Sequence, residues 1–185
     1  MTTLGDHSAY SKAAIILHWL IALLVIGQFV GMQYADTLER TDPSLGTVYM
    51  LHKSSGLTIL AFTVLRLFIR LREGFPALPM HMAGWEVLLA RTTHIVFYAL
   101  LLIMPLSGWL FAVSAARGLD LFGLVPVPVL PSSEVVRELM HEAHEYGAWA
   151  FLVLFVLHVL GALKHHFLDR DMVLTRMLPL VRRRG

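Results

Sequence analysis

The chain has 185 residues, of which 57% are hydrophobic, with a formal net charge of only +2 and a mean hydropathy of +0.67. A soluble domain is roughly 45–50% apolar, and here the excess falls in long uncharged blocks, which excludes an ordinary soluble domain and indicates a membrane protein. The absence of cysteine excludes disulfides, iron–sulfur clusters, thiolate-ligated haem and the Cys-x-x-Cys-His attachment of c-type haem.

Four apolar blocks follow one another along the chain, over about residues 13–34, 50–71, 92–115 and 143–167. Each is long enough for a helix to cross about 30 Å of hydrocarbon at about 1.5 Å per residue. The first block is too long for a cleaved signal peptide. Because lipid offers the backbone no hydrogen-bond partners and the blocks show no period-two pattern, helices are the spanning structure. The sequence therefore predicts an all-α fold, a transmembrane four-helix bundle that forms a single domain over residues 1–185.

The three connections between these helices are polar. The last of them, Ala116–Glu142, is the longest, and it contains Pro126, Pro128 and Pro131. Because proline removes a backbone donor and breaks helices, we expect an irregular loop there.

The distribution of lysine and arginine predicts the orientation of the helices. Eleven basic residues fall on the side of the amino terminus, the second connection and the carboxyl-terminal tail: Lys12, Arg66, Arg70, Arg72, Arg91, Lys164, Arg170, Arg176, Arg182, Arg183 and Arg184. The opposite side carries four: Arg40, Lys53, Arg117 and Arg137. This asymmetry predicts that both termini lie in the cytoplasm.

Four histidines lie within or at the ends of the predicted helices, where a polar side chain is costly and marks a functional candidate. His144 and His158 are 14 residues apart, which corresponds to about 21 Å and almost four turns, so they share one helix face at opposite depths. His52 matches the outer depth of His144, and His18 matches the inner depth of His158. Two imidazole pairs on facing helices of a bundle suit two b-type haems. The alternatives are hydrogen-bonded core histidines and a metal site, which would need three or four ligands at one depth.

Other polar residues leave alternatives open. His94, at the inner start of the third helix, competes with His18 as partner of His158; we favour His18 because the first helix otherwise supplies no ligand. If His94 is not a ligand, it remains a candidate contact for a haem propionate or a quinone. Arg66 is 14 residues after His52, at the inner level, where it would contact haem propionates or act as a positive-inside anchor. His165 is either an interfacial residue or part of a quinone pocket. His141, one turn before His144, is expected in the aqueous loop.

Motifs spread over nearly the whole chain resemble the bacterial cytochrome b561 family of the inner membrane. They are Leu17-His18-Trp19, Leu51-His52-Lys53-Ser54-Ser55-Gly56, Pro105-Leu106-Ser107-Gly108, His144-Glu145 and Leu157-His158. The resemblance implies a multi-pass protein of the bacterial inner membrane with two haem b groups. It also implies that His18, His52, His144 and His158 ligate the haem irons, and that electrons pass between a donor and ubiquinone.

One member type of that family oxidises superoxide on the outer side and passes the electron to ubiquinone. A mouth that steers an anion should be cationic, yet the outer side of this chain is net acidic, although Lys53 and Arg137 could form a local positive patch. The expected function is therefore an oxidoreductase that carries electrons from an outer-side donor, such as superoxide or a redox protein, to ubiquinone. The alternatives are a haem-bearing membrane subunit that links a hydrogenase or dehydrogenase to quinone, and a membrane protein without haem. We expect membrane lipid as a partner, no nucleic acid and no catalytic side chain, because the haems carry the redox chemistry.

Overall fold

The computed structural model describes residues 10–74, 76, 82–112, 119–128 and 132–178. It contains four helices, α1 (Lys12–Asp36), α2 (Ser44–Glu73), α3 (Gly84–Ala112) and α4 (Glu134–Phe167), and each is long and apolar enough to cross a membrane. The predicted all-α architecture of four spanning helices is therefore confirmed. Residues 113–115 of the third predicted block, and Arg182, Arg183 and Arg184 of the tail, lie outside the described residues.

The helices are longer than their apolar blocks because polar turns extend them beyond the hydrocarbon. α4 begins at Glu134, nine residues before the predicted start, and the Ser133 hydroxyl caps it by accepting the N–H of Val136 at 3.3 Å. The predicted loop over residues 116–142 is therefore wrong from Glu134 onwards. His141 is likewise helical rather than a loop residue, and its ring lies 5.1 Å from that of Phe111.

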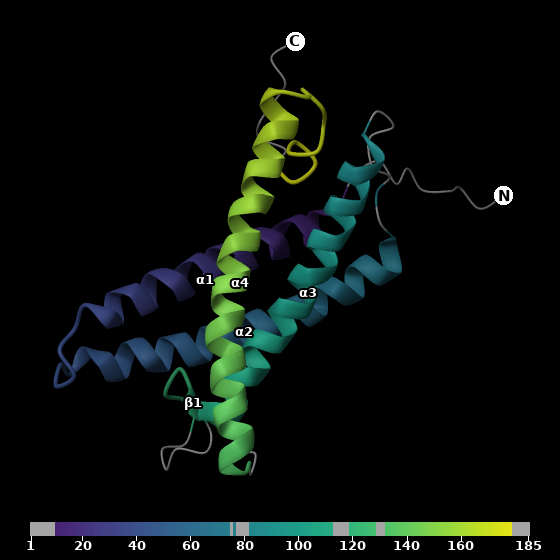
Figure 1. Cartoon of the computed structure of the whole chain (residues 1–185). Coiled ribbons are helices and arrows are strands. Elements are labelled where there is room, and N and C mark those ends of the chain that lie inside the picture. Colours follow the sequence, from purple (N-terminus) through teal and green to yellow (C-terminus); the bar gives the residue numbers. More distant parts are fainter. Residues whose placement is uncertain (1–9, 75, 77–81, 113–118, 129–131, 179–185) are drawn as a thin grey trace.

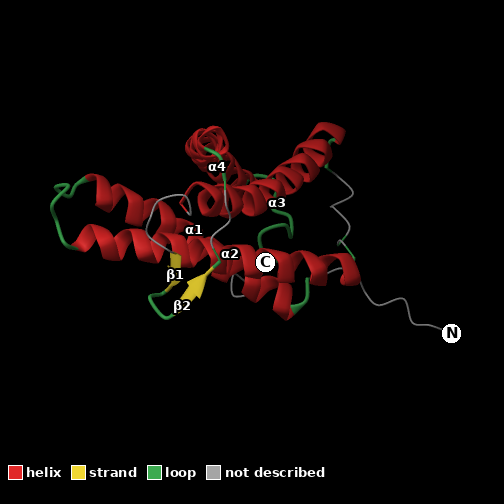
Figure 2. Cartoon of the chain, turned by 90° about the horizontal axis from the view of Figure 1, so that it is seen from below, coloured by secondary structure: helices red, strands yellow, loops and turns green. Residues whose placement is uncertain are grey.

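The helices form two antiparallel pairs, α1 with α2 and α3 with α4, and contacts between α2 and α3 join the pairs. Seen along α4, the pairs make two layers (Figure 2), and the long axes of the layers cross (Figure 1). We call the end that carries the start of α1 and the end of α4 the terminus end, and the opposite end the hairpin end.

A short β-hairpin interrupts the connection between α3 and α4 and gives the hairpin end its name. β1 (Leu119–Leu121) pairs antiparallel with β2 (Val125–Val127), and the turn between them places Phe122 and Gly123 at φ values of 52° and 70°. The fully buried Ser54 of α2 anchors this turn, because its hydroxyl accepts the N–H of Phe122 at 2.7 Å. The hairpin therefore lies against α2 beside His52.

The packed core occupies the middle of the bundle. It contains Ile21, Val25, Ile59, Leu101 and Phe151. Phe97 of α3 packs on Phe151 of α4, with ring centroids 5.3 Å apart. Large apolar side chains on the outer helix faces are exposed, as lipid contact requires, and only Ser, Thr, Arg and Asp contribute buried polar residues among those described.

Candidate functional site

At the hairpin end the structure brings together His52 of α2 and His144 of α4. Their ring centroids are 6.1 Å apart and their planes meet at 77°. Both residues are half-buried. His52 lies two turns inside α2 and His144 lies ten residues inside α4, because both helices begin before the apolar blocks that the sequence indicated.

The backbone of α3 holds the His144 ring in place. Its Nδ1 lies 3.0 Å from the Met104 carbonyl oxygen and 3.1 Å from the Ser107 hydroxyl, which itself donates to the same carbonyl. An Nδ1–H that donates to a carbonyl leaves the Nε2 lone pair available to a metal, which is the usual arrangement of ligating histidines. Gly108 makes room for the ring, because a Cβ on it would lie 3.0 Å from His144 Cε1.

The His52 side of this pair is tied to α1 by an amide. Gln28 Nε2 donates to the His52 carbonyl at 3.0 Å and to the Ser55 hydroxyl at 3.1 Å. His52 Nδ1 is buried and has no hydrogen-bond partner, so burial of this ring carries a cost that a further ligand would relieve. Sequence reasoning missed Gln28, although a lone amide in an apolar block was a signal that pointed to it.

At the terminus end the rings of three histidines lie close together. The ring of His158 lies 6.3 Å from that of His18 on α1 and 5.7 Å from that of His94 on α3. His18 and His158 are half-buried, whereas His94 has the larger exposed fraction although its ring also faces His158; its Nδ1 lies 2.6 Å from the Ala90 carbonyl oxygen. The structure thus places both sequence candidates beside His158, and only His18 shares its half-buried setting.

Arg66 lies beside the terminus-end histidines and is only 8% exposed. Its Nη1 donates to the Tyr98 hydroxyl at 3.0 Å, and its Nε donates to the Ala14 carbonyl at 3.3 Å. A side chain that anchors the helix in the interface would keep its guanidinium in water, so the burial of Arg66 favours an internal contact over an interfacial one. Arg66 is instead an internal cation that links α1, α2 and α3.

The spacing of the two histidine pairs suits one iron between each. Two imidazoles bonded to opposite sides of one metal ion at about 2 Å have ring centroids roughly 6 Å apart. The observed separations of 6.1 and 6.3 Å fall at that value. A direct hydrogen bond between the rings would instead bring two nitrogens to about 3 Å. Along the continuous helix α4, His144 and His158 are separated by about 21 Å, so the two pairs are distinct sites.

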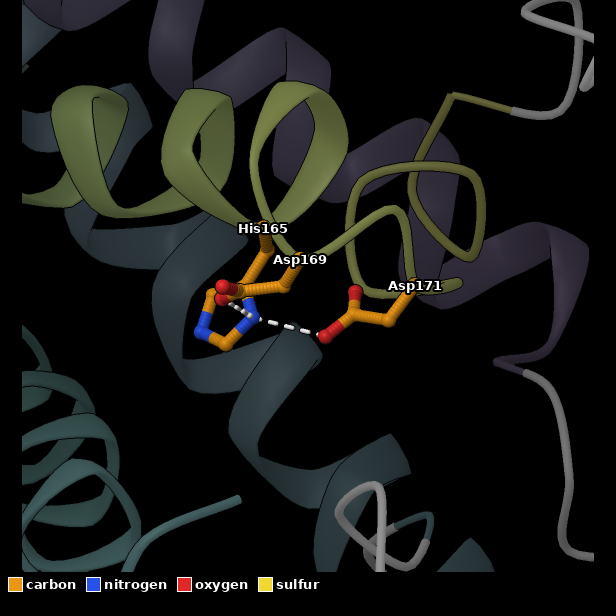
Figure 3. A group of neighbouring side chains, drawn as sticks. All are labelled: His165, Asp169 and Asp171. Atoms are coloured by element: carbon orange, nitrogen blue, oxygen red, sulfur yellow. Dashed lines mark hydrogen bonds and ion pairs between the residues drawn. The ribbon is translucent and has the colours of Figure 1, made fainter. Parts of the chain in front are cut away.

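His165 lies near the end of α4, where two carboxylates of the following segment approach its ring (Figure 3). Its Nδ1 is 2.7 Å from Asp171 Oδ2 and 3.1 Å from Asp169 Oδ2. The side chain is 12% exposed, so His165 is more enclosed than an ordinary interfacial histidine. Asp169 and Asp171 were not singled out in the sequence, because the folding back of the tail cannot be read from residue spacing.

The local positive patch predicted at the hairpin end is weaker than the sequence indicated. Arg137 pairs with Glu134 at 3.1 Å, one turn earlier in α4, so its charge is partly offset. Lys53 directly follows His52 and is half-buried. Of the described basic residues at the hairpin end, Lys53 is the one that adjoins a histidine of the His52–His144 pair in the sequence.

The chain is similar to known proteins over nearly its whole length. A family model described as prokaryotic cytochrome b561 matches residues 9–180. Cytochrome b561 homolog 2 of Escherichia coli K12 is 32% identical over 170 residues, which cover 91% of this chain and 90% of the relative. The probable superoxide oxidase CybB of Yersinia pestis is 30% identical, with 94% and 97% covered. The probable Ni/Fe-hydrogenase B-type cytochrome subunit of Rhizobium leguminosarum is 22% identical, with 91% and 85% covered.

Proposed function

This chain belongs to the prokaryotic cytochrome b561 family of membrane haem proteins, and from that premise we propose that it carries electrons through two haem b groups between an outer-side donor and ubiquinone. It is a multi-pass protein of the bacterial inner membrane. The observation that carries the proposal is the pair of imidazole–imidazole spacings, 6.1 and 6.3 Å, at opposite depths of the bundle.

His52 and His144 are the proposed ligands of the hairpin-end haem, and His18 and His158 those of the terminus-end haem. The bond from His144 Nδ1 to the Met104 carbonyl supports the first assignment, since it fixes the tautomer and the ring direction. The half-buried position of His18 supports the second, because a ligand enclosed by the bundle needs less reorganisation than the exposed His94. Haem b supplies the one-electron redox chemistry when it is bound.

The protein positions the two sites and excludes water between them. Phe151 lies seven residues from each proposed ligand of α4, and its ring contacts Phe97 and Phe29 at 5.3 and 6.3 Å. Phe97 also contacts His158 at 5.3 Å. These aromatic side chains fill the space between the two histidine pairs and keep it apolar. The excess of basic residues at the terminus end supports a cytoplasmic placement of that end and of both termini.

Two polar groups of the terminus end are the proposed contacts for anionic or carbonyl oxygens. Arg66 is an enclosed cation within reach of the histidine cluster, which suits a haem propionate. His165 is seven residues beyond His158 on nearly the same face of α4, which suits the headgroup of ubiquinone. In this proposal quinone is reduced at the cytoplasmic side of the membrane.

Superoxide is the proposed donor, with a redox protein as the second candidate. The relative named as a probable superoxide oxidase is 30% identical, whereas the relative named as a hydrogenase cytochrome subunit is 22% identical. This difference favours a free-standing oxidoreductase over a subunit of a larger complex. The net acidic outer side is unfavourable for an anion, so Lys53, next to His52, is the proposed steering residue.

Rapid mixing of the purified haem-loaded protein with superoxide tests this function. We expect the reduced α-band of b-type haem to appear, and to decay when ubiquinone-1 is added as the acceptor. If superoxide leaves the haems oxidised while a chemical reductant reduces them, the donor assignment is wrong and the subunit alternative is favoured. If reduced haem is stable in the presence of ubiquinone-1, the acceptor assignment is wrong.

A further inference from the structure

The side-chain amide of Gln28 is hydrogen-bonded through its nitrogen but not through its oxygen. Nε2 donates to the His52 carbonyl oxygen at 3.0 Å and to the Ser55 hydroxyl at 3.1 Å. Oε1 is buried and has no hydrogen-bond partner among the described residues. Exchanging the two atoms would not help, because an oxygen in the place of Nε2 would face the His52 carbonyl, which is another acceptor. Gln28 therefore holds a buried acceptor that lacks a donor, which is costly.

His52 has the complementary gap. Its Nδ1 is also buried and has no hydrogen-bond partner among the described residues. A neutral imidazole that binds a metal through Nε2 carries its proton on Nδ1, and that proton needs an acceptor. His144, the other histidine of the pair, has such an acceptor in the Met104 carbonyl oxygen at 3.0 Å. His52 lacks one, while the residue bonded to its backbone has an amide oxygen to offer.

We propose that Gln28 is a positioning residue for His52 and sets the reduction potential of the hairpin-end haem. When His52 Nε2 ligates the iron, His52 Nδ1–H donates to Gln28 Oε1, and both unpaired atoms are satisfied at once. The inference rests on the proposed function, because it needs a haem at the His52–His144 pair. Gln28 acts through the imidazole and not on the iron itself.

The two unpaired atoms belong to residues in direct contact. The oxygen and nitrogen of an amide share one carbon and lie about 2.2 Å apart, so Gln28 Oε1 lies within roughly 5 Å of the His52 carbonyl oxygen. The histidine torsion about Cβ–Cγ is broad and two-fold, so the ring turns at little cost. Turning the ring changes the direction of Nδ1 without moving the backbone, while the two bonds of Gln28 Nε2 hold the amide in place.

The neighbours of the amide leave His52 as its donor. Ser55 gives its single hydroxyl proton to the Leu51 carbonyl at 2.6 Å, so it does not supply the donor that Gln28 Oε1 lacks. Gly56 gives the amide room, because a Cβ at this position would already lie 3.5 Å from Gln28 Nε2. The surface of α2 thus receives the amide of α1 closely and orients it through its nitrogen.

The proposed bond lowers the reduction potential of the haem. A hydrogen bond from Nδ1–H to an acceptor makes the imidazole a more basic ligand. A more basic ligand stabilises the oxidised iron, which carries the greater positive charge, over the reduced iron. Hydrogen bonding around the ligands is one of the means by which a protein sets a haem potential. The acceptor of His144 is a backbone carbonyl that substitution does not remove, so Gln28 is the side chain through which the sequence sets the potential at this end.

Redox titration of the haem-loaded full-length protein tests the proposal, with the two haems distinguished by their electron paramagnetic resonance signals. Gln28→Leu removes the acceptor at little change in size. At a fixed potential, the ratio of oxidised to reduced hairpin-end haem should fall about tenfold, the lower end of the effect of such outer partners. For a one-electron couple, this is a rise in midpoint potential of about 59 mV. The terminus-end haem should keep its potential. Thr63→Val, which removes another buried and unpaired side-chain oxygen from α2, is the matched control and should change neither.

Gln28→Glu separates the role of the amide oxygen from that of the nitrogen. Glutamate keeps an acceptor oxygen but lacks the NH₂ group that donates to the His52 carbonyl. We expect its hairpin-end potential to equal that of the unchanged protein or to lie below it. A potential as high as that of Gln28→Leu would overturn the proposal, because the amide would then act only through its nitrogen.

The remaining outcomes also decide the matter. Equal potentials in Gln28→Leu and the unchanged protein would overturn the proposal. If Gln28→Leu loses the hairpin-end haem, Gln28→Glu decides alone: a potential at or below that of the unchanged protein supports the proposal, and a higher one overturns it. Loss of this haem from both variants would identify a structural role and overturn the proposal. If the unchanged protein binds no haem at the His52–His144 pair, the proposed function fails instead.

Discussion

Replacing Gly108 by alanine should remove the hairpin-end haem and leave the terminus-end haem in place. The added Cβ would lie 3.0 Å from His144 Cε1 and 3.2 Å from Nδ1. Ordinary contact between such atoms needs 3.4–4 Å, so the ring must move by several tenths of an ångström. The movement separates Nδ1 from the Met104 carbonyl, the bond that aims Nε2 at the iron.

The expected effect is a loss of about 1–3 kcal/mol, the usual penalty for overpacking a well-filled site. That penalty corresponds to an affinity for the hairpin-end haem that is roughly five- to 150-fold weaker. Disturbing the hydrogen bond behind a ligating histidine weakens metal binding by a similar factor. General unfolding would not explain the loss, because alanine favours helices over glycine.

Haem quantitation and visible spectra of the purified variant measure the effect. Gly161→Ala is the matched control, because it lies three residues past His158 and its added Cβ meets nothing within 4 Å. We expect Gly108→Ala to keep about half of the haem of the control at low haem supply. Equal haem content and identical spectra in the two variants would refute the placement of His144 as a ligand held against α3.

Three other perturbations follow from the same geometry. His18→Ala should remove the terminus-end haem and His94→Ala should retain it, as measured by haem content. If His18→Ala keeps both haems and His94→Ala loses one, His94 is the ligand. Ser54→Ala should free the β-hairpin from α2, because the Phe122 N–H loses its acceptor at 2.7 Å. Limited proteolysis between residues 119 and 127 should then be faster than in the unchanged protein. An unchanged digestion rate would show that Ser54 does not anchor the turn. Lys53→Gln should lower the rate at which superoxide reduces the haems. Added salt should lower the rate of the unchanged protein toward that of the variant, because salt screens the charge of Lys53. A rate that rises with salt would instead indicate that the acidic residues of the outer side repel superoxide.

The sequence predicted the four spanning helices well because hydropathy is a property of composition over about 20 residues. It placed the helix ends poorly where polar turns extend a helix beyond the hydrocarbon. α4 shows this most clearly, since Glu134 and Arg137 carry charges that an apolar window excludes, yet Ser133 caps the helix ahead of them. The β-hairpin was missed because strands of three residues give too short a pattern to read.

The depths of the histidines could be predicted because helix rise and turn are fixed by backbone geometry. The spacing of His144 and His158 gave two levels, and the structure places one histidine of α2 and one of α1 beside them. Contacts that depend on how the helix pairs cross could not be predicted. Gly108 against His144, and Arg66 on Tyr98, belong to that class, because each joins helices whose relative rotation the sequence does not state.

The number and ligation of the haems test the account most directly. The full-length protein, expressed with ample haem and purified in detergent, should contain two haem b groups per chain, both low-spin with two imidazole ligands by electron paramagnetic resonance. Variants of His52 or His144 should lose one signal, and variants of His18 or His158 should lose the other. A preparation that binds a single haem, or that keeps both signals when His144 is replaced, would contradict the arrangement of two imidazole pairs.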